Sequence, residues 1–90
     1  MSALSRRFEI LVSRTAEKTL RTLPKRDRER VLAAVQRLAY EPFPPGSKKI
    51  TGEDATFRIR VGVYRVIYEV DGERIAILIL KIAHRKDVYR

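Results

Sequence analysis

The feature that most constrains this sequence is the stretch at residues 57–68, FRIRVGVYRVIY, where apolar and polar residues alternate on both sides of a glycine. Alternation with a period of two is typical of β-strands, and Gly62 marks a turn between two of them. The apolar members predict one wall of a core. The polar members include Arg58, Arg60 and Arg65, whose like charges destabilise a sheet. A polyanionic partner would relieve this repulsion.

Three strands are predicted in the second half of the chain, at residues 56–61, 63–70 and 74–83, which are rich in isoleucine, valine and tyrosine. Asp71 and Gly72 favour a two-residue hairpin loop. With two such loops, at residues 61–62 and 71–72, Ile59 pairs with Tyr64 and Tyr68 with Ile75. One face of the sheet then carries Phe57, Ile59, Tyr64, Val66, Tyr68, Ile75, Ile77 and Ile79. The other face carries Arg58 paired with Arg65, together with Arg60, Ile67, Leu78, Leu80 and Ile82.

The first half of the chain predicts one strand and two helices. Residues 7–12 read as a strand with Phe8, Ile10 and Val12 on one face, and Ser13 is a suitable helix N-cap. The apolar stripes of the two helices are Ala16, Leu20 and Leu23, and then Val31, Leu32, Val35, Leu38 and Ala39. The second helix is expected from Lys25 to about Tyr40, before the proline-rich linker at residues 41–47. The cations of both helices are expected to be solvated.

These elements predict an α+β fold with the order β-α-α-β-β-β. A small, mostly antiparallel β-sheet packs on an N-terminal two-helix hairpin. The length of 90 residues suits a single domain with a modest core, spanning residues 1–90.

The chain is strongly basic, with a net charge of +9 that divides into +5 over residues 1–45 and +4 over residues 46–90. The folded body is therefore cationic, which excludes a basic tail on a neutral domain. Nucleic acid, an acidic protein or an anionic membrane surface would each suit such a body, and the alternative is a merely soluble basic domain. Cysteine is absent, so the sequence has no disulfide or thiolate site. We expect a cytoplasmic protein with no cofactor and no membrane-spanning segment.

The arginine-bearing face suits phosphate binding, because a guanidinium fork contacts two phosphate oxygens at once. No spacing of acidic residues predicts a magnesium site, and a pair of catalytic histidines is excluded because His84 is the only histidine. The catalytic chemistry that remains possible is metal-free cleavage of RNA by its own 2′-hydroxyl. His84 could accept the proton, or could be a structural residue at a strand end. Tyr89 could stack on a base or pack against the domain.

At these residues the sequence resembles the RelE/ParE superfamily of type II toxins, and more closely its RelE branch. The matching motifs are FRIRVGVYRVIYEVDGERIAILILKIAHRKDVYR at residues 57–90 and KKITG at residues 48–52. The resemblance implies a ribosome-dependent endoribonuclease that cuts mRNA and is silenced by a cognate acidic antitoxin in a hetero-oligomer. It implies catalytic roles for Arg58, Arg60, Arg65, Arg85 and Tyr89, and RNA-binding roles for Lys48, Lys49 and Lys86.

Two other functions stay open at this stage. Some family members have lysine at the positions of Arg58 and Arg60, and arginine is a poor general base because its pKa is above about 12. A catalytically impaired, antitoxin-binding homologue is therefore one alternative. The other is a ParE-like, non-enzymatic toxin that inhibits DNA gyrase. Arg85 together with Tyr89 favours the RNA-cleaving branch, because gyrase-directed relatives generally lack that combination.

Overall fold

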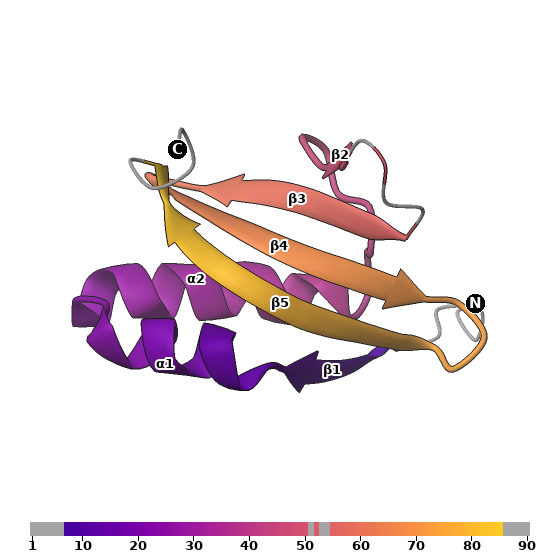
Figure 1. The fold of residues 1–90 in the computed structure, drawn as a ribbon, viewed down its shortest axis with the longest axis horizontal. Helices are drawn as coiled ribbons and strands as arrows, with labels where there is room; N and C mark the ends of the chain where they lie inside the picture. The colour runs from indigo at the N-terminus through magenta and orange to yellow at the C-terminus, as the bar shows by residue number, and fades with distance from the viewer. Residues whose placement is uncertain (1–6, 51, 53–54, 86–90) are drawn as a thin grey trace.

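The computed structural model describes residues 7–50, 52 and 55–85 of the chain. It is a five-stranded sheet whose one face is covered by two helices (Figure 1). The elements are β1 (Glu9–Val12), α1 (Arg14–Thr22), α2 (Lys25–Leu38), β2 (Lys48–Lys49), β3 (Thr56–Val61), β4 (Tyr64–Asp71) and β5 (Ala76–His84). The strand order is β1-β5-β4-β3-β2, and only the pairing of β1 with β5 is parallel. The predicted fold class is confirmed, and β2 is a short addition to it.

The two helices begin where the sequence predicts. The Ser13 side chain accepts a hydrogen bond from the backbone N–H of Ala16 at 3.0 Å, which caps α1. Its hydroxyl also donates to the carbonyl of Leu80 at 2.8 Å and so ties the start of α1 to β5. Pro24 occupies the N-cap of α2. Helix α2 ends at Leu38, two residues short of the prediction, and Leu32 of its predicted stripe is exposed.

The core lies between the helices and the sheet. Its largest fully buried side chains are Tyr68, Leu38, Ile77, Ile79, Val31 and Val66. The Tyr68 hydroxyl donates to the carbonyl of Pro42 at 2.7 Å, so the buried strand holds the proline-rich linker. Burial raises the pKa of Tyr68 to about 12, against a smaller lowering by the Ser47 hydroxyl. Val12, predicted on one strand face with Phe8 and Ile10, is 43% exposed at the end of the edge strand β1.

The β3–β4 hairpin has a two-residue loop, as predicted, but the loop is one residue further along the chain. Val61 pairs with Tyr64, so Gly62 and Val63 form the turn, and Gly62 has φ +61°. The predicted pairing of Arg58 with Arg65 is therefore wrong, because Arg65 pairs with Arg60. The error is two residues, an even number, so every side chain keeps its predicted face.

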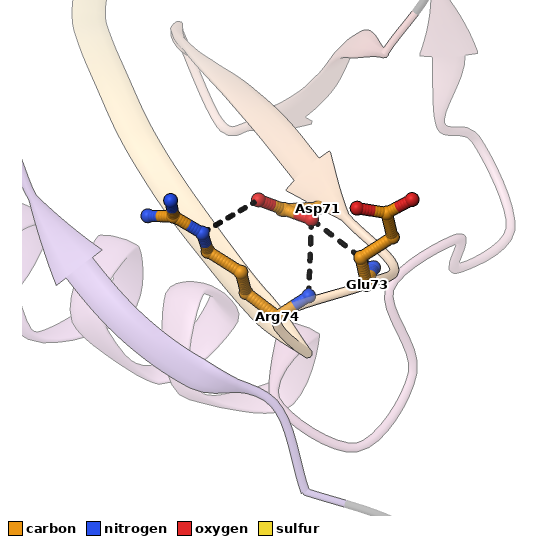
Figure 2. Close-up of polar contacts among 3 residues, drawn as sticks. All are labelled: Asp71, Glu73 and Arg74. Carbon is orange, nitrogen blue, oxygen red and sulfur yellow. Dashed lines mark hydrogen bonds and ion pairs between the residues drawn. The ribbon is translucent and has the colours of Figure 1, made fainter.

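The β4–β5 hairpin departs further from the prediction, because its loop has four residues, 72–75 (Figure 2). The Asp71 carboxylate accepts hydrogen bonds from the backbone N–H groups of Glu73 and Arg74, both at 3.1 Å. Asp71 therefore ends β4 and caps the loop instead of belonging to it. Ile75 adopts φ +54°, a conformation unfavourable for a β-branched residue, and it lies in the turn instead of pairing with Tyr68.

A register shift at Ile67 and Tyr68 corrects the prediction for the end of β5. Val66 pairs with Ile82 and Tyr68 with Ile79, so β5 carries one extra residue between these pairs. As a result Ile82 turns to the core, where it is 2% exposed, although the sequence predicts it on the open face. The shift also pairs Tyr64 with His84 at the end of the sheet.

Candidate functional site

The β3–β4 turn brings three arginines of the open face together. Arg60 and Arg65 lie directly opposite each other at the end of the hairpin. The backbone N–H of Arg85 donates to the carbonyl of Val63 at 2.7 Å, which fixes the end of β5 against the turn. Arg60, Arg65 and Arg85 line a hollow of about 130 Å³ with the turn residues. Every charged residue that lines it, among those that the structure describes, is a cation, so the hollow suits a phosphate group.

A larger groove of about 400 Å³ adjoins this hollow through Arg60, which lines both. Its other cations are Arg58 of β3, Lys48 of β2 and Arg37 of α2. Lys48 pairs with Arg58 across the two strands. Lys49 pairs with Phe57 and therefore lies on the opposite side of β2, where it is exposed.

At the same end of the sheet, on the side that faces the helices, Tyr64 links β4 to α2. The Tyr64 hydroxyl donates to Oδ2 of Asp27 in α2 at 3.1 Å, and its ring meets the His84 ring edge to face at 5.4 Å between centroids. Burial, and then the hydrogen bond with Asp27, raise the pKa of Tyr64. Because His84 pairs with Tyr64 while Arg65 pairs with Ala83, His84 lies on the face opposite to Arg65. This position favours the structural alternative for His84.

Lys86 and Tyr89 lie outside the described residues. Within residues 7–50, 52 and 55–85, no three histidine, cysteine or acidic side chains come together in a group that could hold a metal ion. Over the same residues, none of the helices is both long and apolar enough to span a membrane.

Comparison with known proteins identifies the family. A model described as "ParE toxin of type II toxin-antitoxin system, parDE" matches residues 10–89. The toxin RelG of Mycobacterium tuberculosis is 34% identical over 88 residues, which cover 92% of this chain and 97% of that protein. The chain belongs to the RelE/ParE superfamily of type II toxins. The resemblance seen in the sequence is thereby confirmed, and its RelE-like character rests on the named relatives.

Solved structures agree with this assignment. The toxin is similar to a chain in the archaeal RelE–RelB complex of Pyrococcus horikoshii, with a TM-score of 0.78 and 34% identity, over 87% of this chain and 94% of that one. It is also similar to a chain in the RelBE2 toxin–antitoxin complex of Mycobacterium tuberculosis, with a TM-score of 0.77 and 31% identity over 88% and 92%. It is therefore a RelE-like toxin of a type II toxin–antitoxin system.

Sequence reasoning missed the contribution of helix α2 to the site of this toxin. Arg37 lines the larger groove, and the guanidinium of Arg30 lies 3.6 Å from the position that a Cβ at Gly62 would occupy. Arg30 and Arg37 are seven residues apart, so they share a helix face. That spacing was the available signal. It could not be used without knowing which helix face borders the edge of the sheet.

Proposed function

We propose that this RelE-like toxin is an endoribonuclease that cleaves mRNA on the ribosome without a metal ion and so inhibits translation. The observation that carries the proposal is the hollow at the β3–β4 turn, where Arg60, Arg65 and Arg85 meet. Arg60 and Arg65 stand directly opposite each other across the hairpin. Guanidinium groups gathered at one hollow can contact several oxygens of a single phosphate at once.

The proposed chemistry is an in-line attack of the RNA 2′-hydroxyl on the adjacent phosphorus. The 2′-oxygen forms a bond to phosphorus while the bond to the 5′-oxygen of the next nucleotide breaks. The products are a 2′,3′-cyclic phosphate and a 5′-hydroxyl. Negative charge grows on the phosphate oxygens during this step, and guanidinium groups fixed around the hollow stabilise it. One proton leaves the 2′-hydroxyl and one is gained by the departing 5′-oxygen.

We assign the residue roles as the family resemblance implies them. Arg65 and Arg85 contact the reacting phosphate, and Arg58 and Arg60 hold the strand beside it. Tyr89 stacks on a base, and Lys48, Lys49 and Lys86 bind the RNA backbone. The sequence offers His84 as a proton acceptor, but its ring lies against Tyr64 on the face opposite to Arg65, so we give His84 a structural role. The proposed active unit is a single domain over residues 1–90.

An antitoxin completes the proposal. The similar chains from Pyrococcus horikoshii and Mycobacterium tuberculosis were solved in complexes with an antitoxin. We infer that this toxin likewise forms a hetero-oligomer with a cognate antitoxin, and its net charge of +9 favours an acidic one. The toxin would act in the cytoplasm, where translating ribosomes are found.

Mapping transcript ends after induced expression tests the proposal. New ends inside open reading frames, at codons held by ribosomes, are expected within minutes of induction. A gyrase supercoiling assay with the purified toxin runs in parallel. Intact transcripts together with inhibited supercoiling would replace mRNA cleavage by the gyrase-directed alternative.

That second candidate has one observation in its favour, the ParE description of the matching family model. The fold is common to both branches and cannot decide between them. An inactive homologue that only binds its antitoxin is the third outcome, recognised by intact transcripts and normal supercoiling.

A further inference from the structure

We propose that the mRNA strand runs from the small hollow into the adjoining groove, and that Arg37 of α2 contacts a backbone phosphate there. This inference rests on the proposed function, because it places the RNA that the toxin would cleave. It adds an RNA-binding residue from a helix whose cations the sequence assigns to solvent. The RNA strand would follow the groove, which shares the lining residue Arg60 with the hollow.

The groove follows the outer edge of β3. Strand β2 pairs with Phe57 and Arg58, and beyond that pairing Ile59 and Arg60 of β3 line the groove. Helix α2 supplies one wall through Ala34 and Arg37. The proline-rich linker supplies the other wall. The walls therefore come from three separate parts of the chain, and they leave an extended trough beside the hollow.

The charged residues that line the groove, among those that the structure describes, are all cations. They are Arg37, Lys48, Arg58 and Arg60. The hollow of about 850 Å³ near β1 and the β4–β5 turn differs, because Glu9 lines it beside Arg7 and Arg74. Alternate residues on β3 are about 6.6 Å apart, a spacing similar to that between successive phosphates of an extended strand. The groove therefore matches a chain of anions.

The walls favour a nucleic acid over a free anion. Pro44, Pro45 and Ala34 give the groove apolar surface beside its cations. A ribose or a base can pack against such surface, whereas an inorganic phosphate makes no use of it. An RNA strand accounts for both kinds of lining.

The ion pair of Arg37 with Glu41 can give way to a contact with an RNA phosphate. Its Nη2 lies 3.8 Å from Glu41 Oε1, and the two side chains are 75% and 52% exposed. An exposed pair of this length contributes little to stability, so a phosphate can replace the carboxylate at small cost.

The chain offers a matched control for this residue. Arg21 of α1 pairs with Glu17 at 3.2 Å, with side-chain exposures of 74% and 56%, and it lines neither the hollow nor the groove. Arg37→Ala and Arg21→Ala therefore remove the same charge from equally exposed helical positions. Only the first should weaken RNA binding.

The experiment measures single-turnover mRNA cleavage on programmed ribosomes over a range of toxin concentrations and salt. Arg37→Ala should raise the half-saturating concentration by about three- to tenfold and lower the logarithmic salt slope by about 0.7, while the rate at saturation is unchanged. Arg21→Ala should match the wild type. A second series moves one uncharged methylphosphonate linkage along the mRNA, one nucleotide at a time from the cut. When the uncharged linkage replaces the phosphate that Arg37 contacts, the half-saturating concentration of the wild type should rise to that of Arg37→Ala.

The inference would be overturned if Arg37→Ala and Arg21→Ala had the same half-saturating concentration. It would also be overturned if no methylphosphonate position abolished the difference between Arg37→Ala and the wild type. Either result leaves the proposed function standing if the wild type cleaves. If the wild type cleaves nothing, binding of the same ribosomes is measured instead, with the decoding-site codon 2′-O-methylated. Loss of binding in Arg37→Ala alone would then support the groove while the proposed cleavage fails.

Discussion

The two hairpins of the sheet end in turns of opposite character. The β3–β4 turn sets Arg60 against Arg65, adds Arg85 through a backbone hydrogen bond, and encloses a cationic hollow. The β4–β5 turn places Asp71 beside Arg74, and the Asp71 carboxylate satisfies two backbone N–H groups (Figure 2). One turn gathers like charges, and the other balances opposite charges.

This difference separates a binding surface from a structural one within a single sheet. Balanced charges and a capped loop contribute to stability, whereas opposed arginines reduce it. Such a cost is expected where a ligand of opposite charge binds. We therefore expect substitutions at the β3–β4 turn to reduce cleavage, and substitutions at the β4–β5 turn to change stability without changing cleavage.

The largest effect is expected from Arg85→Ala. The variant keeps the backbone bond to Val63, so it should unfold like the wild type, but it loses one guanidinium beside the reacting phosphate. Cleavage on programmed ribosomes should slow by about 10²-fold. Lys81→Ala removes an exposed cation from β5, the strand that Arg85 follows, and should change the rate by less than about threefold. If Lys81→Ala slowed cleavage as much as Arg85→Ala, the loss of positive charge alone would explain both effects.

The two turn glycines should respond differently to alanine. Gly62 has φ +61°, and the added Cβ would make only ordinary contact with Arg30, so Gly62→Ala should cost about 1–2 kcal/mol through backbone strain. Gly72 has no positive φ and open space around it, so Gly72→Ala should be neutral or stabilising by up to about 1 kcal/mol. Urea unfolding measures both. Equal losses would mean that the two loops share the same backbone requirement.

Tyr68→Phe tests the strand that the two hairpins share. The change leaves the carbonyl of Pro42 without its buried donor and should cost about 1–2 kcal/mol at neutral pH. The folded protein raises the pKa of Tyr68 from 10.0 to about 12, so it favours the neutral phenol. That contribution is complete below pH 10 and is lost as pH rises towards 12.

Urea midpoints measured across this alkaline range check the sign. Tyr68→Phe should lose less stability on going to high pH than the wild type does. The loss should not vanish, because the pKa of Tyr64 is raised in the same direction. A steeper alkaline loss in the variant would show that Tyr68 is not the buried neutral group.

Asp71→Ala should have the smallest effect. It removes two side-chain hydrogen bonds to exposed backbone and should cost about 1 kcal/mol, with cleavage unchanged. Glu73→Ala removes a neighbouring acidic side chain and should stay within about 0.5 kcal/mol of the wild type. Reduced cleavage in Asp71→Ala would contradict the separation of the two turns.

Local patterns predicted much of this fold. Ser13 and Pro24 placed the helix starts, and the alternation around Gly62 placed the arginines on the correct face despite a register error of two residues. The sequence could not show that the Asp71 carboxylate would bond to the loop backbone, which lengthened the second turn. Nor could it show the extra residue in β5, because bulges depend on packing of the whole sheet.

Local sequence patterns also predicted part of the candidate site. Arg60 and Arg65 follow from strand alternation, and Arg85 follows from its position at the end of β5. Arg37 shares a helix face with Arg30, but its place in the site depends on how α2 lies along the edge of β3, a tertiary relation that the sequence pattern does not show.

The most direct measurement compares Arg65→Ala with Arg74→Ala, one arginine from each turn, in single-turnover cleavage of mRNA on programmed ribosomes. Both variants lose one positive charge, and Arg74 is the more remote because it lies in the β4–β5 turn. Arg65→Ala, like Arg85→Ala, should slow cleavage by about 10²-fold, and Arg74→Ala should stay within about twofold of the wild type. Equal rates for the two variants would contradict a catalytic site at the β3–β4 turn.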